Sequence, residues 1–484
     1  MTILFAASEM TPFCKTGGLA DVIGSLSPVL AAMGHEVHVM LPGYADINRA
    51  RFGFNEDCRQ FQIPVGPVTK PATVSFARWN GVAIHLVENG EYFDRPGLYG
   101  DSNGDFYDNG PRFVFYARAV LEAAKCLGIR PAIIHAHDWQ AGLVMPFLET
   151  LYANDELFRK TRTLFTIHNL GYQGVFAQWV FSLTGIPETE FNWLKMEYYG
   201  NVSFLKSGIV YSDAVSTVSP SYAREISDIP LGFGLQGVLE GRGEDLHGIL
   251  NGIDTAEWNP SADNSIPARY GPGDMKGKAS CRRALVKAFG LEAGKNDPVF
   301  GMVTRLDRQK GFEILGKAVE RLAALGIRLA VLGSGDRGCI NALESFAARH
   351  PGRIGFNLRF DPTAARLVYS GADAFLMPSM YEPCGLGQMI AMRYGTLPVV
   401  HGTGGLIDTV TDLDADPEAG NGFVFTEFTD DALVDAAARA VKAFAEPKRS
   451  RWNAAVARGM TADFSWKKSA EEYDALYTAL VKKK

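Results

Sequence analysis

The feature that most constrains this 484-residue chain is a regular alternation of short apolar runs with longer amphipathic segments. Apolar runs at residues 2–8, 36–42 and 132–137 are rich in Val, Ile and Phe and fit strands buried on both faces. Residues 312–326 place apolar side chains on one helical face and end at a glycine. This alternation predicts an α/β fold with parallel sheets and helical crossovers.

The pattern runs through the chain twice, and 484 residues exceed what one hydrophobic core usually holds. We therefore expect two doubly wound domains, at residues 1–245 and 246–460, followed by an amphipathic helix at 461–484. Ligands of open α/β sheets bind beyond the carboxyl ends of the strands. Two such domains predict a ligand site in a cleft between them.

Composition excludes several classes of function. The net charge is −6 and the longest basic stretch is the C-terminal VKKK, so nucleic acids and membrane surfaces are not expected partners. The sequence has no 18-residue apolar run and no signal-peptide pattern at its start, which favours the cytoplasm. Six scattered cysteines without a C-x-x-C pair predict free thiols and no metal site.

Two glycine-rich loops follow predicted strands and open predicted helices. The first is KTGGLADV at residues 15–22, and TGGL recurs at residues 403–406. Glycines let a backbone approach a bulky ligand, and the first helical N–H groups point toward it. With Lys15 as a cation, the first loop suits an anion such as a phosphate; an ordinary turn with a solvent-exposed lysine is the alternative.

Two further loops carry charged side chains. Arg305 and Lys310, in RLDRQKG, could converge on a diphosphate leaving group, although a solvated basic turn is the alternative. Glu382, in EPCGL, could bind sugar hydroxyls or stabilise a cationic sugar, or could be an acidic residue at a helix start. Cys384 is expected to be a small packing residue.

Polar clusters end two successive strands. His135, His137, Asp138 and Trp139 follow one strand, and His168 with Asn169 follows the next. They fit either a site or hydrogen-bonded core positions, and they lack the ligand spacing of a zinc site. Trp139 and the aromatic stretch at 193–199 could stack on sugars or pack in the core.

The segment GSGDRG, at residues 333–338, matches the dinucleotide-binding pattern G-x-G-x-x-G. That fingerprint should open the first strand–turn–helix unit of its domain. Here another such unit, around Arg305, comes first, so NAD binding is disfavoured.

Together the motifs resemble those of bacterial glycogen synthases and plant starch synthases. The shared segments, in family order, are KTGGLADV, HAHDWQ, TIHN, STVSPSYAREI, NGID, RLxxQKG, EPCGL and TGGLxDTV. The resemblance implies the GT-B fold, with two Rossmann-like domains facing each other across a deep cleft. It implies that residues 1–245 bind the glucan and that residues 246–460 bind the nucleotide sugar. It also implies that the helix at 461–484 packs back on the first domain.

The resemblance also implies a retaining glycosyltransferase (EC 2.4.1.21) that moves glucose from ADP-glucose to the non-reducing end of glycogen or another α-1,4-glucan, without metal or cofactor. It implies catalytic roles for Glu382, Arg305, Lys310, His168 and Asp138. It implies contacts with ADP-glucose from Lys15, Gly17, Gly18, Asp21, Asn251, Cys384, Gly385, Leu386, Thr403, Gly404 and Gly405.

The chain departs from the family pattern at several positions. Gly387 stands where a threonine is usual, Met389 and Ile390 replace Leu-Tyr, and Asp307 with Arg308 replaces Thr-Trp. The hydroxyl missing at position 387 could weaken a contact with the phosphate or the sugar of the donor. Rival functions are a glucan phosphorylase, a hydrolase using Asp138 and Glu382, and a non-catalytic sugar- or nucleotide-binding protein. Oligomeric state, acceptor length and regulation stay open.

Overall fold

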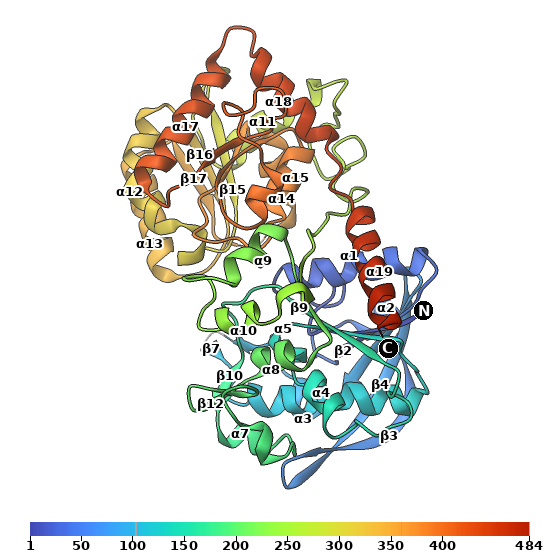
Figure 1. Cartoon of the computed structure of the whole chain (residues 1–484). Helices are drawn as coiled ribbons and strands as arrows, with labels where there is room; N and C mark the ends of the chain where they lie inside the picture. Colours follow the sequence, from blue (N-terminus) through green and yellow to red (C-terminus); the bar gives the residue numbers. More distant parts are fainter. Residues whose placement is uncertain (102–103, 360, 484) are drawn as a thin grey trace. The chain divides into compact units, whose positions relative to one another are not determined.

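The chain forms two compact units, each built on a sheet with parallel strands (Figure 1). The computed structural model describes residues 1–101, 104–359 and 361–483, with the backbone alone at 57–59. Unit 1 comprises Met1–Asn251 and Trp466–Lys484, and unit 2 comprises Gly252–Ser465. The assignment of glucan binding to one domain and nucleotide-sugar binding to the other stays a prediction.

Unit 1 contains a nine-stranded sheet with both parallel and antiparallel strands. In spatial order its strands are β14 (Leu246–Gly248), β13 (Ala214–Thr217), β9 (Arg162–Ile167), β8 (Ile133–His137), β1 (Thr2–Ala6), β2 (Glu36–Pro42), β5 (Val82–Glu88), β4 (Val68–Trp79) and β3 (Asn55–Val65). The strands from β14 to β5 run parallel, and β4 and β3 add an antiparallel edge. The parallel part confirms the pattern that strand–helix alternation predicts.

Helices cover the unit 1 sheet and connect its strands. They are α1 (Gly18–Ala32), α2 (Arg49–Phe52), α3 (Gly90–Phe93), α4 (Asn109–Leu127), α5 (Asp138–Ala141), α6 (Val144–Glu149), α7 (Trp179–Ser182), α8 (Phe204–Tyr211), α9 (Pro220–Ile226), α10 (Gln236–Glu240) and α19 (Trp466–Lys482). Helix α19 contacts α1 and β9, so the chain's last helix completes its first unit (Figure 1). A smaller sheet, β10 (Val175–Ala177), β12 (Asn201–Ser203) and β11 (Glu197–Tyr198), lies in the same unit.

Unit 2 has a six-stranded sheet in which every pairing is parallel. Its order is β17 (Ile354–Asn357), β16 (Arg328–Leu332), β15 (Val299–Val303), β18 (Ala374–Met377), β19 (Leu397–His401) and β20 (Phe423–Phe425). Its helices are α11 (Lys276–Ala288), α12 (Phe312–Ala324), α13 (Arg337–Arg349), α14 (Pro362–Gly371), α15 (Gly387–Arg393), α16 (Gly405–Thr409), α17 (Asp430–Ala445) and α18 (Ser450–Thr461). Helix α12 packs with α13 and α17, whereas α14 packs with α11 and α15, so helices lie on both sides of the strands (Figure 1).

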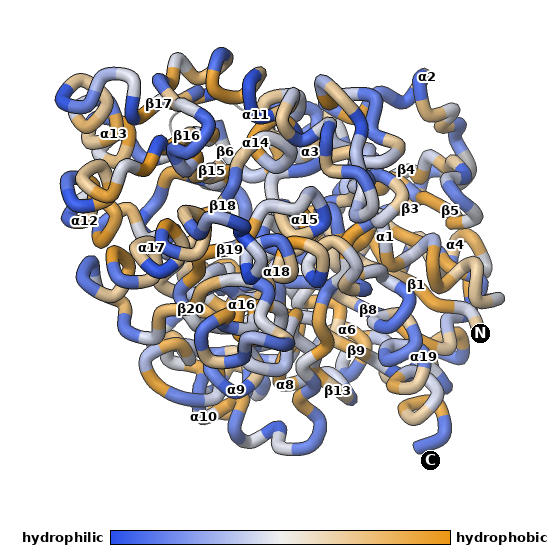
Figure 2. Tube along the Cα trace, turned by 90° about the horizontal axis from the view of Figure 1, so that it is seen from above, coloured by the Kyte–Doolittle hydropathy of each residue, from blue (hydrophilic) through white to orange (hydrophobic). Residues whose placement is uncertain are grey.

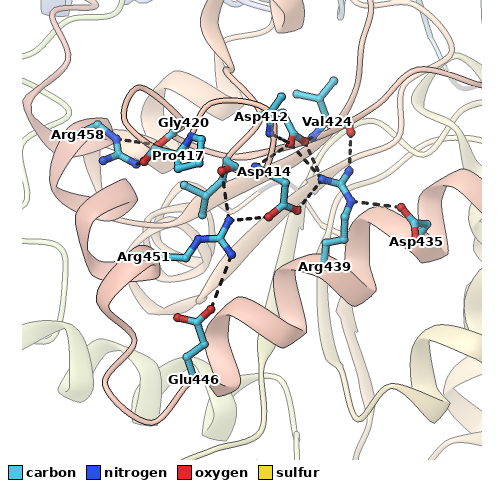
Figure 3. A network of polar contacts seen from close by, with 12 residues as sticks. Asp412, Asp414, Pro417, Gly420, Val424, Asp435, Arg439, Glu446, Arg451 and Arg458 are labelled. Carbon is cyan, nitrogen blue, oxygen red and sulfur yellow. Dashed lines mark hydrogen bonds and ion pairs between the residues drawn. The ribbon is translucent and has the colours of Figure 1, made fainter.

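An arginine–aspartate network holds the loop between α16 and β20 (Figure 3). Arg439 of α17 donates to Asp412 and Asp414, with Nη1–Oδ2 distances of 2.9 and 3.1 Å, and to the Val424 carbonyl at 2.7 Å. Arg451 of α18 donates to Asp414 at 2.6 Å. These contacts fix the segment that follows α16.

Both sheets lie in apolar cores. The side chains of Ile3, Leu4 and Phe5 in β1 are fully buried, and the tube in Figure 2 alternates hydrophobic and hydrophilic segments along peripheral helices such as α12 and α17. No helix in the described ranges combines the length and apolarity that a bilayer crossing requires. The expectation of six free thiols is wrong for Cys126, which is disulfide-bonded. The sulfur atoms of Cys14, Cys281, Cys339 and Cys384 are not in disulfides, and the side chain of Cys58 lies outside the described residues.

Candidate functional site

The topology of unit 2 brings two predicted motifs together. The sheet extends from β15 through β16 and β17 on one side, and from β18 through β19 and β20 on the other. Such a switch point leaves a crevice beyond the carboxyl ends of the two central strands. RLDRQKG directly follows β15, and EPCGL follows β18. The two motifs therefore meet where open α/β sheets bind ligands.

Lys310 and Glu382 form an ion pair at this switch point. Lys310 Nζ donates to both carboxylate oxygens of Glu382, at 2.8 and 2.6 Å, and Ser379 Oγ donates to the same carboxylate at 2.9 Å. The Glu382 residue is 6% exposed. The cation proposed for the diphosphate and the carboxylate proposed for the sugar thus neutralise each other in this ion pair.

The backbone around Lys310 explains its placement. Asp307 caps the short turn Arg308–Lys310 by accepting from the Lys310 N–H at 3.1 Å. Gly311 has a φ of +77°, and a Cβ there would lie 1.8 Å from the Pro378 carbonyl oxygen. A glycine is therefore required for the two loops to approach this closely. Arg305 lies on the same loop with a half-exposed side chain, 3.6 Å from the Asp307 carboxylate.

The TGGL loop packs against the EPCGL loop through backbone atoms. The Gly405 N–H donates to the Glu382 carbonyl at 3.1 Å, and a Cβ at Gly404 would lie 2.0 Å from the same oxygen. A Cβ at Gly405 would lie 2.3 Å from the Cys384 carbonyl oxygen. In this structure the Gly405 N–H is thus bonded within the protein, while the phosphate contacts predicted for Gly404 and Gly405 stay predictions. Thr403, just before them, is buried.

Gln388 secures the start of α15, which follows EPCGL. Its side-chain amide donates to the carbonyls of Cys384 and Gly385, at 3.1 and 2.8 Å, and to Thr409 Oγ1 at 3.1 Å. Gly385 has a φ of +72°, and Leu386 caps the helix through its backbone carbonyl. These bonds make the turn between Glu382 and α15 well defined.

Gly387, which replaces the usual threonine, lies against the Phe375 ring. A Cβ at Gly387 would lie 3.0 Å from Cε1 of the Phe375 ring. That distance is too tight for a larger residue unless the ring moves. The fully buried Met389 lies on the same helix. The departures at positions 387, 389 and 390 are therefore packed against the interior of unit 2, whereas Arg308 lies exposed in its turn.

In unit 1 the KTGGLADV loop follows β1, and a carboxylate that sequence reasoning missed organises it. Glu9 is 3% exposed and accepts from the N–H groups of Thr16 and Gly17, at 2.5 and 3.1 Å. Tyr99 Oη also donates to Glu9, at 2.7 Å. The signal for Glu9 was its position directly after the first strand, but no repeated motif marked it.

Lys15 is paired within its own loop. Its Nζ lies 2.7 Å from both carboxylate oxygens of Asp21, and burial raises the pKa of that aspartate. Among the described residues, apart from chain neighbours and the helix's own backbone, nothing lies within 4 Å of a Cβ built at Gly17 or Gly18. The glycines at this helix start therefore face open space, unlike Gly404 and Gly405.

The polar residues that end β8 and β9 form one buried cluster. His137 Nδ1 and His168 Nε2 share a hydrogen bond of 3.0 Å, and Asp138 accepts from the His168 N–H at 2.7 Å. Burial lowers the pKa of His168 to about 3 and raises the pKa of Asp138 to about 7, against the lowering effect of the N–H groups of His168 and Asn169. Asp138 also has a φ of +55°, in the left-handed region that aspartate adopts more readily than most residues other than glycine.

A second chain of hydrogen bonds supports this cluster from α19. His135 bonds to Tyr477 Oη at 2.7 Å and to Thr166 Oγ1 at 2.5 Å, and Thr166 bonds to Ser216 at 2.6 Å. His135 is thus a structural residue of the core, one of the two readings that the sequence left open. Trp139 also packs among aromatic rings, with its centroid 4.8 Å from that of Phe113.

Asn251 lies at the last position of the first segment of unit 1. It is 6% exposed, and among the described residues its Oδ1 has no hydrogen-bond partner. A buried acceptor without a partner suits a site that a ligand completes. Across the described part of the chain, no group of three or more His, Cys, Asp or Glu is arranged to hold a metal ion.

Comparison with known proteins agrees with this geometry. The family "Starch synthase catalytic domain" matches residues 2–241, and "Glycosyl transferases group 1" matches residues 287–458. A glycogen synthase from Elusimicrobium minutum is 44% identical, with 100% of both chains covered, and one from Geotalea daltonii is 43% identical over the same shares. This chain belongs to the glycogen synthase family.

A solved structure extends the agreement to the fold. The catalytic domain of starch synthase IV from Arabidopsis thaliana, bound to ADP and acarbose, is 32% identical, with 99% of each chain covered and a TM-score of 0.92. Sucrose-phosphate synthase from Thermosynechococcus elongatus, 19% identical, matches over 99% of each chain with a TM-score of 0.62 and shows the fold alone. The predicted GT-B fold of a glycosyltransferase is confirmed.

Proposed function

We propose that this family member transfers glucose from ADP-glucose to the non-reducing end of an α-1,4-glucan and retains the anomeric configuration. The observation that carries the proposal is the Lys310–Glu382 ion pair at the switch point of unit 2. Lys310 lies on the same loop as Arg305. The ADP and acarbose bound to starch synthase IV support a nucleotide donor and a glucan acceptor. Because the donor is a soluble nucleotide sugar, the proposal includes a cytoplasmic location.

In the proposed reaction, the bond between glucose C1 and the distal phosphate oxygen of ADP-glucose breaks, and ADP leaves with the bonding electrons. Arg305 and Lys310 stabilise the charge that develops on the diphosphate, since fixed cations lower such barriers. Glu382 stabilises the cationic sugar. The acceptor 4-hydroxyl attacks C1 from the face that ADP leaves, and its proton passes to the departing phosphate oxygen.

The cluster in unit 1 is proposed to recognise the acceptor sugar. With its low pKa, His168 is neutral at pH 7 and can exchange hydrogen bonds with hydroxyl groups. Asp138 is proposed to lie beside the same sugar. The open space above Gly17 and Gly18 is proposed to admit the donor, with Lys15 turning from Asp21 toward its phosphates.

The first experiment separates this reaction from its rivals. Purified protein is incubated with glycogen and labelled ADP-glucose, and in parallel with labelled UDP-glucose. Incorporation of label into glycogen, faster from ADP-glucose, is the expected result. Glucose 1-phosphate formed from glycogen and phosphate would indicate a phosphorylase. Free glucose released without a donor would indicate a hydrolase, and no turnover would favour a binding protein.

A second experiment tests whether the Lys310–Glu382 pair is catalytic or merely structural. Lys310→Ala leaves a buried carboxylate unpaired and should lower Tm as well as kcat, the latter on the order of 10²-fold or more. The double variant Lys310→Ala/Glu382→Gln removes the unpaired charge and should restore Tm but not kcat. Recovery of activity together with Tm would assign the pair to stability alone.

A further inference from the structure

The EPCGL and TGGL loops of unit 2 are joined by side chains as well as by backbone. Helix α15 follows EPCGL, helix α16 begins within TGGL, and the two helices contact each other (Figure 2). Gln388 lies in the first turn of α15 and Thr409 ends α16, and both residues are buried. The side-chain amide of Gln388 donates to Thr409 Oγ1 at 3.1 Å, a contact that we call the Gln388–Thr409 bridge.

The Gln388–Thr409 bridge extends to the backbone of both loops. On one side, the Gln388 amide also donates to the carbonyls of Cys384 and Gly385, at 3.1 and 2.8 Å. On the other side, Thr409 Oγ1 donates to the Gly405 carbonyl at 2.6 Å. Because the hydroxyl hydrogen is used in that bond, the Thr409 oxygen can only accept from its other neighbour, and an amide N–H supplies the donor. The two side chains therefore tie the EPCGL turn to the helix that begins within TGGL.

The oxygen of the same amide argues against a purely stabilising role. Gln388 is fully buried, and among the described residues its Oε1 has no hydrogen-bond partner. A buried acceptor without a partner costs stability, and an apolar side chain of similar shape would avoid that cost. The N–H groups of the amide, which bond to both loops, are therefore what this position requires.

Backbone contacts make the positions of the two loops interdependent. The Gly405 N–H donates to the Glu382 carbonyl at 3.1 Å, and a Cβ at Gly404 would lie 2.0 Å from the same oxygen. The Glu382 carboxylate in turn pairs with Lys310. A shift of α16 would therefore displace the backbone that carries Glu382, and a misplacement of reacting groups by about 1 Å can cost on the order of 10²-fold in rate.

We propose that Gln388 and Thr409 are positioning residues for the transfer reaction, because their bridge keeps the EPCGL and TGGL loops in one fixed arrangement. The proposal rests on the proposed function for the reaction that it serves. Neither side chain touches the substrate in this proposal, since both act through the backbone of the loops. Loss of the bridge should lower turnover, whereas affinity for glycogen should not change, since the glucan is proposed to bind unit 1.

Substitutions of Thr409 test the bridge by kinetics. Valine has nearly the shape of threonine but no hydroxyl, so Thr409→Val should lower kcat about ten-fold or more while KM for glycogen stays at the wild-type value. Thr409→Ser keeps the hydroxyl and should have the wild-type kcat. Equal losses in both variants would overturn the proposal, because packing and not the hydroxyl would then be responsible.

The matched control is Tyr270→Phe, elsewhere in unit 2. It removes the bonds from the Tyr270 hydroxyl to the carbonyls of Ser370 and Tyr394, at 3.1 and 2.9 Å. The control should lower Tm and keep the wild-type kcat, with all rates measured well below the lowest Tm of the set. If the control lost as much turnover as Thr409→Val, a loss of hydrogen bonds anywhere in unit 2 would explain the effect, and the proposal would fail.

A double variant tests whether the two residues act as one unit. Gln388→Met keeps the length of the side chain but removes its N–H groups, so it should lower kcat at least as much as Thr409→Val does. The double variant Gln388→Met/Thr409→Val should be no slower than the slower single variant, as expected for residues that share one interaction. Losses that multiply, or a wild-type kcat for Thr409→Val, would contradict the bridge.

Hydrogen exchange followed by mass spectrometry makes the test independent of turnover. Peptides from residues 379–388 and 403–410 report on the two loops separately. Gln388→Met and Thr409→Val should each speed exchange in both segments, whereas Tyr270→Phe should speed it in neither. Faster exchange confined to the segment that carries the substitution would overturn the coupling of the loops. A wild type that transfers no glucose would overturn only the proposed function, and the exchange rates would still decide whether the bridge couples the loops.

Discussion

Replacing Asp138 with asparagine tests the electrostatics of the unit 1 cluster. Asparagine keeps an oxygen that can accept from the His168 N–H, and it tolerates the positive φ at this position. The substitution therefore removes the ionisable proton with little change of shape. Because burial raises the pKa of Asp138 to about 7, the folded protein holds a proton that the unfolded chain has already lost above pH 4.

The sign and size of the effect follow from that difference. A carboxyl whose pKa is raised on folding costs no stability below its unfolded pKa of about 3.9, and its penalty grows until the pH passes the folded value. A difference of about three pKa units between the two states corresponds to about 4 kcal/mol at most. Asp138→Asn should thus match the wild type near pH 4 and become more stable than it by several degrees in Tm at pH 8.

Differential scanning calorimetry at pH 4, 6 and 8 measures this difference, and subtracting the wild type at each pH removes the contribution of other groups. The same variant should lose glucosyl transfer, because Asp138 is proposed to contact the acceptor. A Tm difference that stays constant with pH, or a loss of stability that grows toward pH 8, would refute the assigned pKa and its cause.

Three further predictions concern the loops. Gly18→Ala places its Cβ in open space, so it should leave Tm unchanged but raise KM for ADP-glucose at least about ten-fold. Gly405→Ala should instead lower Tm, because its Cβ would meet the Cys384 carbonyl. Equal kinetics for Gly18→Ala and the wild type would show that the loop at Gly18 does not contact the donor. Gly387→Thr should cost about 1–3 kcal/mol in urea unfolding, and Phe375→Leu in the same chain should recover part of it. Arg439→Gln should lower Tm at pH 7. Burial raises the pKa of Asp412, but hydrogen bonds from the Val424 N–H and from Arg439 outweigh burial and hold that pKa below its usual range. The stabilisation by the Asp412 carboxylate is lost as the pH falls through this lowered pKa, so the Tm difference between the variant and the wild type should shrink below about pH 4.

Much of the architecture was predictable because parallel sheets leave a strong pattern. Strands buried on both faces produce continuous apolar runs, and the motif residues follow those runs in the sequence. Lys310 and Glu382 could be named as candidates from residue type and position. Their ion pair could not be predicted, because 72 residues separate them. They meet only because β15 and β18 are neighbours in the sheet, and neither motif indicates that strand order.

Other features lacked a local signal. Glu9 is a single acidic residue that follows a strand, and no motif marks it. It is held in place by a hydrogen bond from Tyr99, which is 90 residues away in the sequence. The antiparallel strands β3 and β4 lie at a sheet edge, where the strand–helix alternation that guided the prediction is interrupted. The bonding of the Gly405 N–H to the Glu382 carbonyl depends on how closely two loops approach, a distance that composition does not encode.

The position of α19 has a consequence for biosynthesis. His135 forms its hydrogen bond with Tyr477, a residue that leaves the ribosome 342 positions later. Domains generally fold in the order in which they are translated. Here the first unit cannot be completed until α19 has been synthesised, so a nascent chain must carry an incomplete first unit while its second unit folds. Expressing that half alone would therefore require grafting the final helix onto it.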